Sequence, residues 1–125
     1  MATEILVNDG GAPARILPFT AGADLSGGHA VIMSADGFVD PAGAAATNVL
    51  GFAFTDATSG NNCSIITGKG VVLNAYVSGT AASGALLQVE ASGDLKAGTT
   101  ADAGVAVMLG NDTGGAAALR PVLTG

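Results

Sequence analysis

Glycine interrupts this chain too often for long helices to form. The sequence holds 20 Gly among its 125 residues, and a further 25 are Ala. Apolar residues do not recur at the three- and four-residue spacing of an amphipathic helix over any long window, and glycine in a helix interior is destabilising. Short apolar runs instead alternate with Gly, Ser, Asp and Asn, a pattern typical of β-strands joined by tight turns.

The apolar runs predict about seven or eight strands at a spacing of roughly 8–12 residues, which is typical of a sandwich or a barrel. In the clearest run Val71, Leu73, Ala75 and Val77 would share one face. The other predicted strands cover residues 29–33, 38–39, 48–54, 63–67, 85–90, 104–109 and 117–123. We therefore expect an all-β fold, either a small β-sandwich or a β-barrel-like domain of about 7–9 short strands.

The first residues differ from the rest of the chain. The apolar tripeptide Ile5–Val7 is followed at once by a break rich in Gly and Pro, and Pro18 interrupts the next apolar run. Proline suits an edge strand or an extended segment because it cannot donate a backbone hydrogen bond. We expect residues 1–17 to form an extended N-terminal arm and residues 18–125 to form a single β domain. The arm is either a frayed terminus or a strand that pairs with a neighbouring chain.

A weak internal repeat runs through the predicted domain. Residues 28–37 and 84–93 each read turn, strand, turn between two glycines, and an Ala-Gly pair follows each of them within about six residues. A Gly-led strand comes next in both cases, at Gly51 and at Gly104. Chance matches are expected in a chain of such low complexity. Two duplicated hairpin units and a domain without internal repetition therefore both stay open.

The charge balance excludes several partners. Charged residues make up 11% of the chain, and the net charge is −6. The four basic residues Arg15, Lys69, Lys96 and Arg120 are too few and too scattered to follow phosphates, so we expect no nucleic acid partner. The uncharged run of residues 70–89 splits into two strand-sized halves and does not predict a membrane span. The first residues do not resemble a signal peptide. We therefore expect a soluble protein made in a reducing cytoplasm.

Residues for catalysis are scarce. His29 is the only histidine and Cys63 the only cysteine, and neither lies in a motif that would activate a nucleophile. Gly68-Lys69-Gly70 fails the phosphate-loop pattern, because Cys63 stands where that pattern needs Gly and Gly70 where it needs Ser or Thr. The aspartates are dispersed and fit turns and a solvated surface. We expect no enzyme activity, no cofactor and no metal. The enzymatic alternative is a small β-barrel hydrolase or isomerase that uses His29 or Cys63.

Four segments then carry a resemblance to a known family. They read Ala-Gly-Ala-Asp-Leu-Ser-Gly-Gly at residues 21–28, Ser-Ala-Asp-Gly-Phe-Val at 34–39, Asn-Val-Leu-Gly-Phe-Ala-Phe-Thr-Asp-Ala at 48–57 and Ile-Ile-Thr-Gly-Lys-Gly-Val-Val at 65–72. With these motifs the chain resembles the head-decoration (capsid cement) proteins of tailed bacteriophages over most of its length. The motifs are short and are made of common residues.

The resemblance implies a structural virion protein that binds the exterior of an assembled capsid and bridges neighbouring capsomers. Its expected partners are the major capsid protein and further copies of itself, as a homotrimer, and it would be made in the host cytoplasm. A thin apolar core independently favours a homo-oligomer. Contacts with the capsid or between protomers are expected from the N-terminal region, at Ile5, Leu6, Val7, Arg15 and Phe19.

Other binding functions remain as alternatives. A phage tail module, a fibre base or another repetitive surface protein would have a similar composition. A carbohydrate-binding module is a further alternative, although the five aromatic residues provide few stacking platforms. The position of the protein on the particle would distinguish these structural roles.

Overall fold

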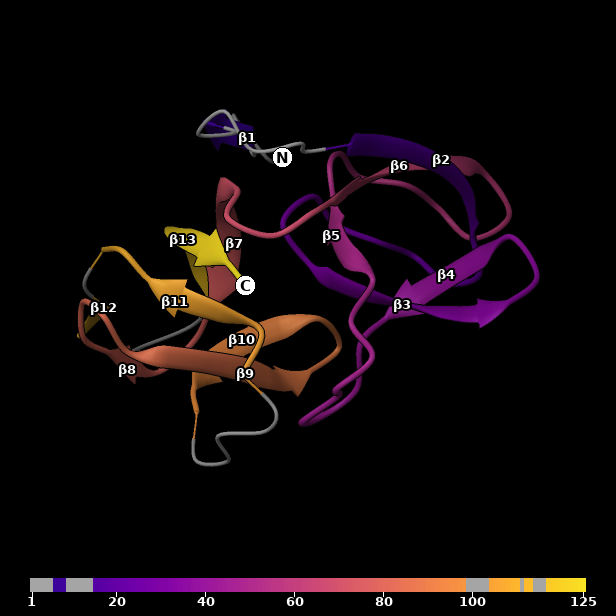
Figure 1. The fold of residues 1–125 in the computed structure, drawn as a ribbon. Coiled ribbons are helices and arrows are strands. Elements are labelled where there is room, and N and C mark those ends of the chain that lie inside the picture. The colour runs from indigo at the N-terminus through magenta and orange to yellow at the C-terminus, as the bar shows by residue number, and fades with distance from the viewer. Residues whose placement is uncertain (1–5, 9–14, 99–103, 111, 114–116) are drawn as a thin grey trace.

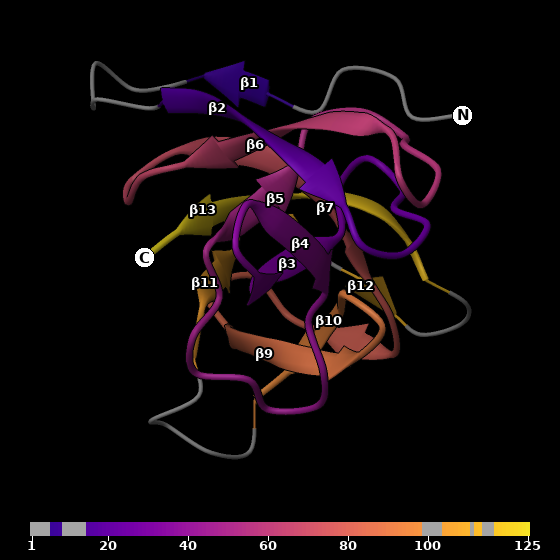
Figure 2. The same ribbon diagram turned by 90° about the vertical axis from the view of Figure 1, so that its right-hand side faces the viewer.

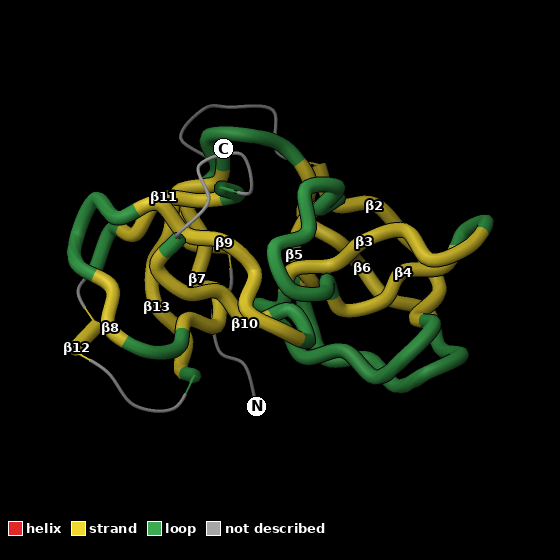
Figure 3. The backbone as a smooth tube through the Cα atoms, turned by 90° about the horizontal axis from the view of Figure 1, so that it is seen from below, coloured by secondary structure: helices red, strands yellow, loops and turns green. Residues whose placement is uncertain are grey.

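The computed structural model describes residues 6–8, 15–98, 104–110, 112–113 and 117–125 of the chain. Strands, turns and loops account for these residues, and they contain no helix (Figure 3). The strands are β1 (Leu6–Asn8), β2 (Arg15–Ala21), β3 (Ala30–Ala35), β4 (Phe38–Pro41), β5 (Gly51–Ala53), β6 (Asn62–Thr67), β7 (Val72–Val77), β8 (Thr80–Ala81), β9 (Leu86–Ala91), β10 (Asp94–Ala97), β11 (Ala106–Met108), β12 (Asp112–Thr113) and β13 (Ala118–Thr124). The prediction of an all-β, barrel-like fold is confirmed. The strands outnumber the 7–9 expected because several of them have only two to four residues.

The chain forms two barrels, one after the other in the sequence, and they lie side by side in space (Figure 1). The first barrel closes in the order β2-β4-β3-β5-β6, with β2 parallel to β4 and antiparallel to β6. The second barrel runs β7-β10-β9-β11-β13, and the pairing of β13 with β7 closes it. Strand β7 is likewise parallel to β10 and antiparallel to β13. The second barrel therefore repeats the strand order and directions of the first.

The pairing register is repeated as well. Met33 lies opposite Val39 in the β3–β4 hairpin, and Val89 lies opposite Leu95 in the β9–β10 hairpin. Each hairpin also has a register irregularity next to its turn. The equivalence extends beyond the hairpins, because the isolated bridge between Leu25 and Ala57 corresponds to the β8–β12 pair. We call two residues counterparts when they occupy the same register position in the two barrels.

Backbone hydrogen bonds outside the strand ladders follow the same repeat. Gly28 N–H donates to Ala53 at 2.9 Å, and its counterpart Gly84 N–H donates to Met108 at 2.7 Å. Gly28 and Gly84 both have positive φ, at 98° and 84°. Glycine takes this conformation without the steric cost that a Cβ atom brings. The glycines that bound the two hairpins therefore fix the same turns twice.

The side chains of adjacent residues serve two different cores. In β5 Ala53 faces the interior of the first barrel, while Phe52 belongs to the core of the second barrel. In β6 Ile65 and Ile66 divide in the same way. Strand geometry explains the division, because successive side chains point to opposite faces. One flank of the first barrel thus packs into the second barrel, and we call this contact the seam.

The second barrel shows the alternation that the sequence predicted. Val71, Leu73, Ala75 and Val77 all have 0% exposed area, whereas the residues between them are partly exposed. The prediction for this strand is confirmed. Many core positions on both barrels hold alanine: Ala21, Ala30, Ala42, Ala53, Ala75, Ala81 and Ala106. Small interior side chains suit barrels this narrow.

The N-terminal region is tied to the barrels where the structure describes it. Strand β1 pairs antiparallel with β7, with Leu6 opposite Leu73 (Figure 2 shows β1 at the top of the view). Strand β2 begins at Arg15, which lies opposite Thr67 in β6. The boundary that the sequence predicted after residue 17 therefore lies within β2. Residues 1–5 and 9–14 of the expected arm are outside the described residues.

Two counterpart glycines provide a test of the seam. Gly93 has φ +86°, and a Cβ atom there would lie 2.8 Å from the Cβ atom of His29 across the seam. Gly37 has φ +77°, with no atom within 4 Å of an added Cβ. We expect Gly37→Ala to lower the free energy of unfolding by about 1–2 kcal/mol, the cost of a left-handed residue. Gly93→Ala should lower it by a further 1–3 kcal/mol or so because the seam must shift.

Chemical denaturation of the two variants measures this difference, with the wild-type chain as reference. Gly37→Ala is the matched control, because it carries the backbone cost without the contact across the seam. Equal losses in the two variants would contradict a tightly packed seam at Gly93.

Candidate interaction surfaces

The residues predicted to make contacts lie in three different environments. Ile5 is outside the described residues, and Leu6 and Val7 lie in β1, whose backbone pairs with β7. Arg15 is exposed at the start of β2, where its carbonyl accepts a hydrogen bond from the Thr67 hydroxyl at 3.1 Å. Phe19 is half-buried and packs against the core of the first barrel. The structure therefore places Arg15 and Phe19 on one strand and Leu6 and Val7 on another.

Large apolar side chains are exposed on both barrels. The first barrel exposes Ile16, Leu17, Met33 and Phe38, and the second barrel exposes Leu86 and Leu109. Only Ile16 and Leu17 belong to the segment that the sequence singled out. The sequence could not identify the others, because alternation predicts which residues share a face but not which end of a barrel is left uncovered. Exposed apolar patches on a soluble protein are candidate interaction sites.

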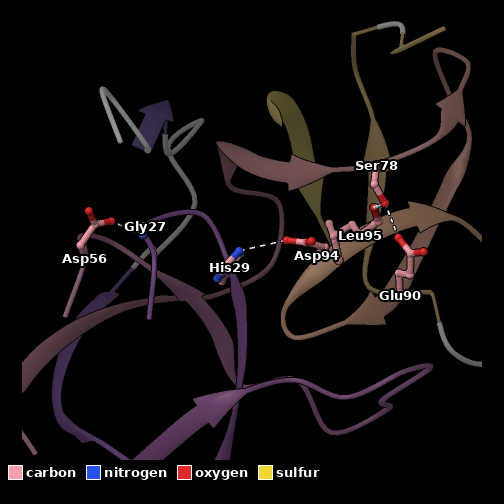
Figure 4. Close-up of polar contacts among 7 residues, drawn as sticks. All are labelled: Gly27, His29, Asp56, Ser78, Glu90, Asp94 and Leu95. Atoms are coloured by element: carbon pink, nitrogen blue, oxygen red, sulfur yellow. Dashed lines mark hydrogen bonds and ion pairs between the residues drawn. The ribbon is translucent and has the colours of Figure 1, made fainter. Parts of the chain in front are cut away.

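The seam between the barrels is polar at one side (Figure 4). His29 Nε2 donates to Asp94 Oδ1 at 2.9 Å, and the His29 and Tyr76 rings lie 4.8 Å apart. Ala30 N–H donates to the Gly93 carbonyl at 3.0 Å in the same place. The sequence allowed either a structural or a catalytic role for His29. In the structure its side chain contacts Asp94 and Tyr76 of the second barrel.

Other carboxylates secure loops. Asp56 Oδ1 accepts from Gly27 N–H at 2.8 Å, and Asp24 Oδ1 accepts from Ser59 N–H at 2.9 Å. The Ser78 hydroxyl donates to the Glu90 carboxylate (Figure 4). The two aspartates thus join loops that are distant in the sequence through side chain to backbone hydrogen bonds. The predicted role of the aspartates as turn residues is confirmed for Asp36, which lies in the turn between β3 and β4.

Cys63 points into the first barrel and has 5% exposed area. Its Sγ atom lies 3.5 Å from the Phe19 carbonyl oxygen. Burial raises the pKa of the Cys63 thiol above its ordinary value, because the thiolate would lose hydration. A thiol is a poor nucleophile compared with a thiolate. This environment favours a packing role for Cys63.

A cleft of about 360 Å³ lies between the barrels, and the side chains of Leu50, Phe52, Lys69, Val105 and Thr124 contribute to its walls. None of the described residues that line it is a His, Cys, Asp or Glu. Over the described part of the chain, no cluster of three or more such residues could hold a metal ion. The same residues include no helix with the length and apolar character needed to cross a membrane.

Comparison with known proteins identifies a similar fold. No protein family matches the sequence, and no curated protein matches it. A solved structure of the head fiber gp8.5 N base of bacteriophage phi29 is similar, with a TM-score of 0.71 and 10% sequence identity. The match covers 90% of this chain and 94% of the phage chain. The two proteins therefore share a fold over nearly their whole lengths.

The environment of Cys63 predicts slow reaction with thiol reagents. We expect the native protein to react with Ellman's reagent at neutral pH at least about tenfold more slowly than the unfolded protein, because the thiol is buried and protonated. The release of the coloured thiolate, followed with and without denaturant, measures both rates. Cys63→Ala should abolish the signal in both states. A native rate equal to the unfolded rate would contradict the buried, protonated thiol.

Proposed function

We propose that this chain is a structural virion protein of a tailed bacteriophage that binds the exterior of the assembled capsid. The observation that carries the proposal is the likeness of nearly the whole chain to a head fiber base of phage phi29. The motifs that resemble head-decoration proteins come from the sequence and support the same location independently. The net charge of −6 suits a position away from packaged DNA.

On the capsid, the protein would bridge neighbouring capsomers. A homotrimer presents its contact surface three times, so weak contacts add through multivalency. Binding to the assembled lattice and not to free subunits stabilises the lattice by mass action. The described residues provide apolar surface for such contacts at Ile16 and a charged side chain at Arg15.

The N-terminal segment is the proposed anchor. Residues Ile5–Val7 would add a strand to the edge of a capsid sheet, where backbone hydrogen bonds provide the affinity. In the free chain β1 shares only two register pairs with β7, and the register shifts between them. Such a short pairing can be exchanged for another sheet edge at low cost, because each net hydrogen bond contributes about 0.5–1.5 kcal/mol.

A second candidate function is the base of a fibre. The name of the similar structure refers to the base of a head fiber, and this observation favours an anchor for an appendage. A fibre base and a capsid cement protein would both bind the head. They differ in whether the bound protein holds further protein mass above it and in whether its loss weakens the capsid.

The test is binding to capsids assembled from the major capsid protein of the same genome. We expect the full chain to sediment with expanded capsids and to raise the temperature at which they break open. Cryo-electron microscopy of the decorated capsids should show its density on the outer surface, between capsomers. Binding without thermal stabilisation, with the chain at the foot of a fibre in virions, would favour the second candidate. Failure to sediment with capsids would contradict both.

The anchor is tested by deleting residues 1–8, which removes β1 and leaves β2 complete. The deletion should leave the thermal unfolding temperature nearly unchanged, because the second barrel is still closed by β7 and β13. It should weaken capsid binding by about 10- to 100-fold, corresponding to the loss of two or three backbone hydrogen bonds. Co-sedimentation at increasing protein concentration measures the affinity. Unchanged capsid binding by the folded, shortened chain would show that the arm is not the anchor.

A further inference from the structure

Because the two barrels have the same fold, each has both surfaces that could form a seam, the flank and the face. Only the flank of the first barrel and the face of the second barrel are in contact within one chain. At the seam, the flank of the first barrel packs against one face of the second barrel. The second barrel has its own copy of that flank, and the first barrel has its own copy of that face. Neither copy is covered by the residues that the structure describes.

The receiving face on the first barrel is apolar and exposed. Three residues of the second barrel that lie at or near the seam have counterparts on this face of the first barrel. These counterpart pairs are Leu73 and Leu17, Val89 and Met33, and Asp94 and Phe38. The second-barrel residues Leu73 and Val89 have 0% exposed area, whereas Leu17, Met33 and Phe38 have 37%, 42% and 40%.

The docking flank on the second barrel is apolar and exposed too. Ala30, which is fully buried in the seam, has the counterpart Leu86, with 41% exposed area. Phe54, which packs against the seam core, has the counterpart Leu109, with 44% exposed area. Five of the six exposed large apolar side chains in the described residues therefore lie on a counterpart of the seam, and the sixth, Ile16, is adjacent to Leu17.

We propose that two copies of this chain dock head to tail through these surfaces. The flank of one copy, Leu86 and Leu109, packs against the face of the next copy, Leu17, Met33 and Phe38. The chemistry of the two surfaces supports a second copy as the occupant. Where the seam holds the hydrogen-bonded side chains of His29 and Asp94, the counterpart contact brings Ala85 against Phe38, so an apolar residue meets an apolar residue.

The contact between copies differs from the seam in its backbone. Tyr76 N–H donates across the seam to the Gly28 carbonyl at 3.1 Å. Its counterpart Thr20 N–H already donates to Gly37 within the first barrel, at 2.9 Å. The contact between copies therefore rests on side chains, and it is weaker and more dependent on concentration than the seam. Because its two surfaces are different, the contact is heterologous, and repeating it gives either a closed ring or an open filament.

The inference deepens the self-association within the proposed function, but it rests on the fold and can be tested without a capsid. Phe38→Asp should block the face, and Leu86→Asp or Leu109→Asp should block the flank. Each variant alone should sediment as a monomer in analytical ultracentrifugation, at concentrations where the wild-type chain forms larger species. Thr80→Asp is the matched control, because it adds the same charge at an exposed position where the first barrel has Asp24.

A mixture of the two kinds of variant distinguishes this geometry from others. A Phe38→Asp chain keeps an intact flank and a Leu109→Asp chain keeps an intact face, so an equimolar mixture should form dimers although each component is monomeric. Thermal unfolding checks that every variant is folded. A wild-type chain that stays monomeric at its highest soluble concentration would overturn the inference, as would a mixture without dimers. Capsid binding by a monomeric Phe38→Asp chain would leave the proposed function standing.

Discussion

The packing of the first barrel into the second is the interaction on which the rest of the structure depends. The side chains of Phe52 and Ile66 belong to strands of the first barrel but pack in the core of the second barrel. Each barrel alone has a small interior filled largely by Ala, Val and Leu. Small domains bury a small fraction of their surface and are correspondingly marginal. The shared core joins the two halves into one unit, and the hydrogen bonds at Gly93 and Ala30 fix their relative orientation.

The sequence predicted the local features of this fold but not its pairing. Alternation in residues 71–77 identified the buried face of β7, because a period of two is a property of neighbouring residues. Ring closure depends on β7 meeting β13, and no local pattern encodes a pairing between residues so distant. The glycines at 28, 37, 84 and 93 were detectable because positive φ restricts the residue type.

Elsewhere the two halves keep the same backbone with different side chains. The pair of Phe19 and Cys63 in the first barrel corresponds to Ala75 and Arg120 in the second. Cross-strand pairing uses backbone groups, so the two barrels keep the same register although their side chains differ. The sequence likewise identified only part of the contact surfaces. The apolar N-terminal run and Arg15 could be singled out from the sequence. The exposure of Met33, Phe38, Leu86 and Leu109 depends on which surfaces the seam covers, and the sequence does not encode this locally.

Edge protection explains why a neighbouring copy would meet a face and not a strand. On the second barrel β1 covers the edge of β7 near Val72 and Leu73. On the first barrel the corresponding edge carries Pro18 at the counterpart of Asn74. Since Thr20 N–H points toward this edge and reaches Gly37, the residue two positions earlier faces the same way, and proline there offers no N–H to an added strand. Proline on an edge opposes pairing with another chain. The exposed Leu17, Met33 and Phe38 side chains are not restricted in this way, and they leave the first barrel a surface for side-chain packing.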